Sequence, residues 1–330
     1  VILINCTNIR MDNLALGNNL QGAYLYYSND CTISRSNITR TGTESYYGGG
    51  VVLRYSSGNS ISENYFGNRN YYDVNIYSSN NNNVSKNIIR DSDNTGIYVI
   101  QNSNSNRICE NTIANSNYQG MLLQFSCMYN TICGNNITES KYYGLYMHSS
   151  SHNDISANSI TQTKPVGVTG LYLGGGQFNI IHENNITNNY ADGIEIFSSD
   201  NNTFYGNTIK SNADSGIFIT GSSNNTFYHN NIINNPVAVV SPSTYINFWN
   251  SSYPSGGNYW SGYTGVDIYS GINQNETGSD GIGDSAYNIG GNNTDYYPLM
   301  GPFSNFSISY QEETYYIATS CNSTISDFQF

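Results

Sequence analysis

The 330-residue chain is poor in charge, in proline and in long apolar runs. Only 10% of its residues are charged, and 11 Lys and Arg stand against 23 Asp and Glu, for a net charge of −12. So few bases argue against nucleic acid or an anionic membrane surface as a partner. No run of about 18 apolar residues occurs, so the sequence predicts no transmembrane span.

The chain also lacks a recognisable signal peptide and begins with Val1 rather than Met. It starts and stops in strand-like sequence, at Val1-Ile2-Leu3-Ile4 and at Ile325-Ser326-Asp327-Phe328. We therefore expect a mature or proteolysed portion of a longer secreted protein.

Two short phrases recur in phase along the chain. The first is Asn-x-Ile or Asn-x-Phe, and its apolar anchors are Phe66, Ile89, Ile113, Ile137, Ile160, Ile186, Ile209 and Ile232. The second is Gly-Ile-x-Ile or a close variant, and its copies begin at Gly96, Gly120, Gly144, Gly170, Gly193 and Gly216. Because both return about every 24 residues, they indicate a solenoid.

Within each repeat, short period-two strands alternate with Asn, Ser, Gly and Asp, which favour turns. A repeat of this length closes one coil, and stacked coils pair their strands in parallel. The sequence thus predicts an all-β fold, a right-handed parallel β-helix of about ten coils. We expect residues 1–243 to form the β-helix, 244–303 a Tyr- and Trp-rich C-terminal cap, and 304–330 the start of a following β module or a linker.

The 54 Asn residues have a structural interpretation. Asn tolerates the left-handed conformation at strand corners and can bond the equivalent Asn of the next coil. We therefore interpret the Asn two places before each anchor, such as Asn111 before Ile113, as a rung of an internal ladder rather than as a ligand.

The six cysteines suggest disulfides in an oxidised, extracellular protein. Stacked residues of adjacent coils lie within reach of a disulfide, and the cysteine spacings lack a zinc pattern. The candidate pairs are Cys109 with Cys133, Cys6 with Cys31 and, by remainder, Cys127 with Cys321.

Twelve Asn-x-Ser/Thr sequons occur, about as many as the composition gives by chance, so their number carries no information. In an extracellular protein some would still carry glycans. The candidates are Asn37, Asn83, Asn136, Asn185, Asn250 and Asn275.

The outward positions of the Gly-Ile-x-Ile strand are rich in aromatic residues. Contiguous apolar patches of this kind mark binding or assembly surfaces. The face could stack on sugar rings, dock another chain or lie under a folded-back segment, and a solvated face of strand-forming Tyr is the remaining alternative. The candidate residues are Tyr24, Tyr26, Tyr98, Leu122, Tyr146, Tyr172, Phe197 and Phe218.

The repeats resemble the parallel β-helix repeats of NosD-type proteins and of the carbohydrate-binding and sugar-hydrolase repeat families. Blocks at residues 256–261, 279–284 and 295–299 resemble the end of such domains in surface proteins of methanogenic and related archaea. This resemblance implies an archaeal cell-surface protein. Separately, the end of a solenoid exposes an apolar edge that must be covered, so we expect Trp249, Trp260 and the nearby Tyr residues to cap it. Asp280 and Asp284 lie in a turn that resembles a calcium loop, so calcium is the one cofactor that we consider.

Enzymes on this fold need clustered acids, or bases beside acids, on one face. The chain has few bases and no Asp-Asp pair, although Glu195 could pair with Asp214. We therefore expect a non-enzymatic structural or adhesive module that assembles with copies of itself or with other surface-layer proteins. The alternatives are a module that binds polysaccharide through its aromatic face, and a carbohydrate-active lyase or hydrolase.

Overall fold

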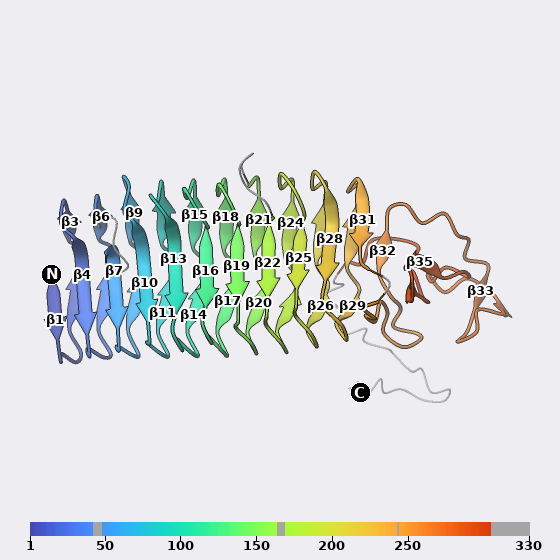
Figure 1. Ribbon diagram of the computed structural model, residues 1–330, viewed down its shortest axis with the longest axis horizontal. Coiled ribbons are helices and arrows are strands. Elements are labelled where there is room, and N and C mark those ends of the chain that lie inside the picture. Colours follow the sequence, from blue (N-terminus) through green and yellow to red (C-terminus); the bar gives the residue numbers. More distant parts are fainter. Residues whose placement is uncertain (42–47, 164–168, 243, 305–330) are drawn as a thin grey trace, which may run out of the picture.

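The computed structural model describes residues 1–41, 48–163, 169–242 and 244–304. Its strands form three long parallel sheets that run the length of a β-helix, with a smaller irregular region at the C-terminal end (Figure 1). This architecture confirms the predicted all-β solenoid of about ten coils. None of the described residues belongs to a helix long and apolar enough to cross a membrane.

Each coil contributes one strand to each sheet. The first sheet contains β1 (Ile2–Ile4), β4 (Gln21–Tyr26), β7 (Gly49–Arg54), β10 (Tyr72–Tyr77), β13 (Thr95–Ile100), β16 (Met121–Gln124), β19 (Leu145–His148), β22 (Leu171–Gly174), β25 (Ile194–Phe197), β28 (Ser215–Thr220) and β31 (Val237–Val240). The second contains β2 (Arg10–Asp12), β5 (Thr32–Ser34), β8 (Ser60–Ser62), β11 (Asn83–Ser85), β14 (Arg107–Cys109), β17 (Thr131–Cys133), β20 (Asp154–Ser156), β23 (Ile180–His182), β26 (Thr203–Tyr205) and β29 (Thr226–Tyr228).

The third sheet ends in the C-terminal region. Its strands are β3 (Ala15–Gly17), β6 (Asn37–Thr39), β9 (Tyr65–Gly67), β12 (Ile88–Arg90), β15 (Thr112–Ala114), β18 (Asn136–Thr138), β21 (Ser159–Thr161), β24 (Asn185–Thr187), β27 (Thr208–Lys210), β30 (Asn231–Ile233) and β32 (Tyr259–Trp260). Two short antiparallel pairs follow, β33 (Tyr269–Ser270) with β34 (Glu276–Thr277) and β35 (Tyr287–Gly290) with β36 (Asn293–Asp295).

The apolar anchors lie inside the β-helix and stack from coil to coil. Ile89 pairs with Ile113, and Ile113 pairs with Ile137, in the register that the phrase predicts. All three side chains are fully buried. Burial of each such side chain contributes about 1.5–3 kcal/mol, and a single coil could not provide it alone.

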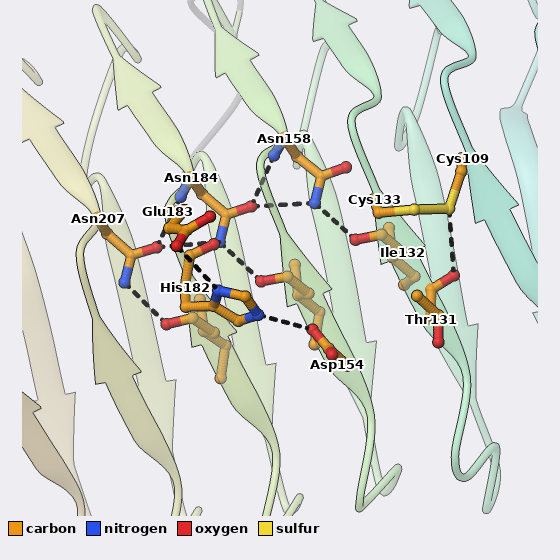
Figure 2. Close-up of polar contacts among 12 residues, drawn as sticks. Cys109, Thr131, Ile132, Cys133, Asp154, Asn158, His182, Glu183, Asn184 and Asn207 are labelled. Atoms are coloured by element: carbon orange, nitrogen blue, oxygen red, sulfur yellow. Dashed lines mark hydrogen bonds and ion pairs between the residues drawn. A yellow bond between two sulfur atoms is a disulfide. The ribbon is translucent and has the colours of Figure 1, made fainter. Parts of the chain in front are cut away.

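The predicted Asn ladder is present between the second and third sheets (Figure 2). The Oδ1 atom of Asn135 accepts the backbone N–H of Asn111 at 3.0 Å and its side-chain N–H at 3.0 Å. The Nδ2 atom of Asn111 also donates a hydrogen bond to the carbonyl oxygen of Val84, in the preceding coil, at 2.9 Å. Since buried polar groups need partners, this repeated pattern accounts for the buried amide in every coil from Asn64 to Asn230.

A second ladder, which the sequence analysis missed, lies between the first and second sheets. Asn106 bonds Asn130 with its backbone N–H at 2.8 Å and with its side chain at 3.1 Å. We had expected the ladder Asn residues to adopt the left-handed conformation. Instead the residue before each of them adopts it, as at Glu110 (φ 60°) and Ser105 (φ 55°).

The C-terminal region ends both ladders, which explains its sequence. Asn293 Oδ1 accepts the backbone N–H of Asn247 and the indole N–H of Trp249, at 2.9 and 3.0 Å. Asp295 Oδ2 accepts the backbone N–H of Asn258 and the indole N–H of Trp260, both at 2.8 Å. Both indoles are buried, so the region covers the apolar end of the last coil, as a cap must.

The cysteines follow the prediction only in part. Cys109 and Cys133 pair on β14 and β17, with 4.5 Å between their Cα atoms, and form a disulfide (Figure 2). Cys6, Cys31 and Cys127 are free, and Cys321 lies outside the described residues. The predicted Cys6–Cys31 pair is therefore wrong.

The first coil is shorter than the spacing of Cys6 and Cys31. Arg10 pairs with Thr32, so Cys31 stacks on Ile9 and not on Cys6. The backbone N–H of Cys6 instead bonds the Ser28 hydroxyl, whereas that of Cys31 bonds Asn59 of the second ladder. The two thiols thus belong to different columns of the β-helix.

Candidate functional site

The outer face of the first sheet carries two rows of side chains in the predicted register. One row passes from Tyr24 through Val52, Asn75, Tyr98, Leu122, Tyr146, Tyr172 and Glu195 to Phe218. The other passes from Tyr26 through Arg54, Tyr77, Ile100, Gln124, His148 and Gly174 to Phe197 and Thr220.

On β10, β13 and β16 the side chains of the first row are buried. Tyr98 and Leu122 retain only 4% and 7% exposure. They form a second small core with Tyr72 and Ile100, and Tyr72 stacks on Tyr98 at a ring-centroid distance of 4.4 Å. The prediction that Tyr98 and Leu122 belong to an accessible binding face is corrected, because their aromatic neighbours cover them.

At the N-terminal end, Tyr24 and Tyr26 are partly exposed and belong to another aromatic group. Their ring centroids lie 6.2 Å apart, and Tyr26 contacts Tyr27 at 4.5 Å. The guanidinium of Arg54 lies 4.7 Å from the centre of the Tyr77 ring, a cation–π contact. This end of the face is therefore aromatic and carries positive charge.

The half of the face on β19, β22 and β25 is more open. Tyr146 and Tyr172 stack with ring centroids 4.7 Å apart and an interplanar angle of 4°, and both are partly exposed. Tyr143, which precedes β19, contacts both rings at 5.0 and 5.2 Å. Together with Glu195, on the strand after Tyr172, these residues form what we call the tyrosine–glutamate cluster.

Glu195 is the acid of this cluster. Its Oε2 atom accepts the Thr169 hydroxyl at 3.2 Å, and the structure gives it no ion pair with a described base. Burial, with help from the nearby Asp192 carboxylate, raises the pKa of Glu195 above its usual range. Burial also raises the pKa of Tyr172 to about 12, so the phenols remain protonated donors.

Asp192 is the acid whose charge affects the pKa of Glu195. Asp192 is buried, and its Oδ1 accepts both the hydroxyl and the backbone N–H of Ser215, the latter at 3.0 Å. Asp214 acts on Asp192, where its charge adds to the burial that raises the pKa of Asp192. The Glu195–Asp214 pair that the sequence allowed is therefore not the interaction that raises the pKa of Glu195, on which the charge of Asp192 acts instead.

Gly174 makes room for the cluster. A Cβ atom there would lie 2.6 Å from the Tyr172 ring, so that ring crosses the glycine. In the next coil Phe197 pairs with Gly174 and is 47% exposed, and Phe218, beside Glu195, is partly exposed. The two phenylalanines of the predicted face therefore border the cluster on its C-terminal side.

The second sheet carries another polar group, formed by His182 and Asp154 (Figure 2). His182 Nε2 lies 3.1 Å from Asp154 Oδ1, and the ring stacks on Tyr205 at 4.7 Å. The other ring nitrogen, Nδ1, is buried. Because neither nitrogen is available to a substrate, this pair is a weaker candidate for acid–base chemistry than Glu195.

The predicted calcium turn is held by its own backbone. Asp284 accepts the backbone N–H of Tyr269 at 3.1 Å, and Asp280 accepts that of Ile282 at 3.0 Å. Asp267 also bonds the Asp280 and Gly281 N–H groups. Among the described residues, no three His, Cys, Asp or Glu gather closely enough to hold a metal ion, and calcium binding stays a prediction.

The predicted glycosylation sites all lie away from the first sheet. Asn37, Asn136 and Asn185 are exposed first residues of β6, β18 and β24 in the third sheet. Asn83 begins β11 in the second sheet, and the remaining two lie in the cap, where Asn275 is exposed and Asn250 partly so. Modification at these positions would leave the tyrosine–glutamate cluster uncovered.

Two residues with unusual chemistry escaped the sequence analysis. Tyr143 lies in the turn before β19 and had no place in the strand rows. Asp73 occupies the position where neighbouring coils have Gly50 and Gly96, so the interrupted phrase Tyr-Asp-Val-Asn-Ile could have revealed it. Burial raises the pKa of Asp73 to about 7, and its carboxylate accepts Asn70 Nδ2 at 2.6 Å and the Ser92 hydroxyl.

Family comparison agrees with the coil architecture. Residues 1–160 and 100–275 match the model described as right handed beta helix region. The chain belongs to this right-handed β-helix family. No curated protein sequence matches it.

Solved structures share the β-helix at low identity. The A-module of an Azotobacter vinelandii mannuronan C-5 epimerase is 15% identical, with 75% of this chain and 74% of that one covered and a TM-score of 0.65. A mutant of a periplasmic alginate epimerase is 14% identical, with 74% and 75% covered and a TM-score of 0.61.

A tailspike protein mutant of an E. coli bacteriophage, in complex with a pentasaccharide, is 14% identical. The match covers 78% of this chain and 55% of that one, with a TM-score of 0.60. At these identities the likeness concerns the fold. Carbohydrate-modifying enzymes nevertheless stand among the neighbours, and this finding overturns our expectation of a non-enzymatic module. The NosD type, the archaeal origin and the surface-layer partners stay predictions.

Proposed function

We propose that this chain is a carbohydrate-active protein that binds a polysaccharide at the tyrosine–glutamate cluster, where Glu195 transfers a proton to or from the bound sugar. The observation that carries the proposal is a partly buried carboxyl group with a raised pKa beside two parallel, partly exposed tyrosine rings. Aromatic rings with a polar tip suit both the apolar face and the hydroxyl groups of a sugar.

The raised pKa of Glu195 supports this role. A carboxyl that keeps its proton closer to neutral pH is a better general acid than an ordinary surface carboxylate. One Glu195 oxygen accepts the Thr169 hydroxyl at 3.2 Å, and the other has no hydrogen-bond partner among the described residues. Activity should fall as the pH rises through the Glu195 pKa where Glu195 donates the proton, and should rise over the same range where Glu195 accepts it.

The charge of the face favours an uncharged polysaccharide. From β16 to β31 the two outward rows contain the Glu195 carboxyl and neither Lys nor Arg. The whole chain also carries a net charge of −12. Among the described residues of these two rows, no cation would offset the repulsion of a polyuronate, whereas a neutral chain would meet no such repulsion.

The test is a panel of neutral and acidic polysaccharides incubated with the wild-type protein. Reducing ends would report hydrolysis, absorbance of unsaturated products would report elimination, and deuterium uptake from solvent would report epimerisation. Binding is compared in Tyr146→Ala and in Tyr228→Ala, a partly exposed tyrosine of the second sheet. We expect Tyr146→Ala alone to lose binding, and equal binding by both variants would exclude the cluster.

A further inference from the structure

The turns between the first and second sheets contain one column of left-handed residues. The residue before each Asn rung of the second ladder, from Asn59 to Asn225, has a positive φ, and so has the equivalent residue of the two preceding coils. Its members are Asn8, Asp30, Gly58, Asn81, Ser105, Tyr129, His152, Phe178, Asn201 and Asn224. Most of them are the small residue types that tolerate this conformation best.

Three consecutive coils depart from that rule. Tyr129, His152 and Phe178 have φ angles of 57°, 57° and 56°. Their rings stack, with centroids 5.1 and 5.2 Å apart. Tyr129 is 61% exposed and Phe178 is 50% exposed. We call these three residues the turn ridge.

Stability does not account for the turn ridge. Strain at three bulky left-handed residues is of the same order as the gain from two exposed ring stacks. The rings fill no part of the core, because the ladder residues Asn130, Asn153 and Asn179 behind them are buried and fully bonded to one another. An exposed row of rings that adds no net stability points to a ligand.

We infer that the turn ridge is a second contact for a neutral polysaccharide, separate from the tyrosine–glutamate cluster; its ligand class rests on the proposed function. The ridge follows β16, β19 and β22, of which β19 and β22 carry the open part of the first sheet. It lies in turns along the lower long edge of the β-helix in Figure 1.

The residues around the ridge also suit an uncharged sugar. Gln177, the exposed neighbour of Phe178, presents an amide, and its backbone N–H is bonded to Ser151 at 3.0 Å. Tyr129 and Phe178 are flanked along the column by Ser105 and Asn201, whose short side chains leave the outer ring faces open. Ring faces beside amide and hydroxyl groups are what a pyranose requires.

The test replaces the ridge with the residue types that the column uses elsewhere, in the triple variant Tyr129→Ser, His152→Asn and Phe178→Asn. We expect this variant to fold, because other coils carry Ser105 and Asn201 at the equivalent left-handed position. The control is Ile88→Asn, a 44% exposed apolar residue on the third sheet. Retardation in gels that contain each neutral polysaccharide is compared for wild type, the triple variant, Tyr146→Ala and the control.

We expect the triple variant to bind about tenfold more weakly, with unchanged thermal stability and unchanged turnover of short oligosaccharides. Binding by the triple variant within about twofold of wild type would overturn the inference. If Tyr146→Ala then binds more weakly than wild type, the proposed function still stands. Loss in the triple variant alone would support the ridge and exclude the cluster. If no polysaccharide retards the wild-type protein, both the inference about the turn ridge and the proposed function are overturned. A dimer in solution that the triple variant abolishes, with polysaccharide retardation unaffected, would instead make the ridge an interface between copies of this chain and would overturn the inference.

Discussion

The outer face of the first sheet contains two aromatic regions that look alike in sequence and differ in structure. On β10, β13 and β16, Tyr72, Tyr98 and Leu122 are almost completely buried. On β19 and β22, Tyr146 and Tyr172 remain partly exposed and face an acid. One region is a second core, and the other has the properties of a binding site.

The difference follows from the neighbours of each row. Tyr71 and Tyr77 pack against the buried region, and the adjacent column supplies Ile100. Around Tyr172 the same positions hold Gly174 and, in the next strand, Glu195. An aromatic row is therefore structural where other large side chains cover it, and it is accessible where glycine or a carboxylate replaces them.

The largest expected effect separates the two regions by stability. Tyr98→Ala should lower the free energy of unfolding by about 3 kcal/mol, because it empties a buried site. Tyr146→Ala, at a partly exposed position, should cost less than about 1 kcal/mol. Urea unfolding of both variants measures this contrast, and equal losses would remove the distinction between the regions.

Asp73 gives the buried region a pH dependence. Its pKa is raised from 3.8 to about 7, so the folded state holds a proton that the unfolded chain releases. Stability is then greatest below about pH 4 and falls as the pH rises towards 7, by at most about 4 kcal/mol.

Asp73→Asn tests this sign directly. The variant keeps an acceptor and a donor for Asn70 and Ser92 but cannot ionise, so its stability should change much less between pH 4 and about 8. Thermal unfolding across that range is the measurement. The raised pKa of Asp73 would be contradicted if the wild-type protein became more stable as the pH rises to 7 and the stability of Asp73→Asn did not change with pH.

The disulfide links two coils of the buried region. Cys109 lies on β14, the strand after β13, and Cys133 lies on β17, the strand after β16, at a sequence separation of 24. The chain-entropy model assigns such a link about 3 kcal/mol, and stacked coils that are already paired should lower that value. Cys109→Ser with Cys133→Ser should thus reduce the melting temperature and leave polysaccharide binding unchanged, whereas Cys6→Ser should alter neither.

Gly174→Ala addresses the open region with the smallest change. The added methyl group would lie 2.6 Å from the Tyr172 ring and should displace it. We expect binding to weaken by about tenfold, with a loss of stability near 1 kcal/mol. Gly262→Ala, where nothing lies within 4 Å of the new Cβ, is the control. Unchanged binding in Gly174→Ala would show that Tyr172 is not a contact.

Much of the fold could be predicted because it depends on local repetition. The anchors and the first Asn ladder each follow from a phrase that recurs from coil to coil, and the outward rows follow from period two. Cys109 and Cys133 pair in a regular coil. Cys6 and Cys31 flank a shorter one, in which Arg10 pairs with Thr32, and spacing alone misplaced them.

The site was only partly predictable because it depends on contacts between rows. Burial of Tyr98 arises from Tyr72 and Ile100, which lie in other columns, and Tyr143 reaches the cluster from a turn. The cap bonds residues far apart in sequence, as when Asp295 accepts the Trp260 indole N–H. Our expectation of a non-enzymatic module relied on the family resemblance, the disulfides, the aromatic face and the missing clusters of acids and bases. None of these says anything about a single carboxyl with a raised pKa.

The central claim is that the cluster binds a polysaccharide and that Glu195 does chemistry on it. The most direct test measures binding and turnover together in Glu195→Gln, with Glu183→Gln, an exposed acid of a corner turn, as the control. We predict that Glu195→Gln binds the polysaccharide as wild type does and turns it over at least about 100-fold more slowly. Turnover equal to that of wild type would contradict the account.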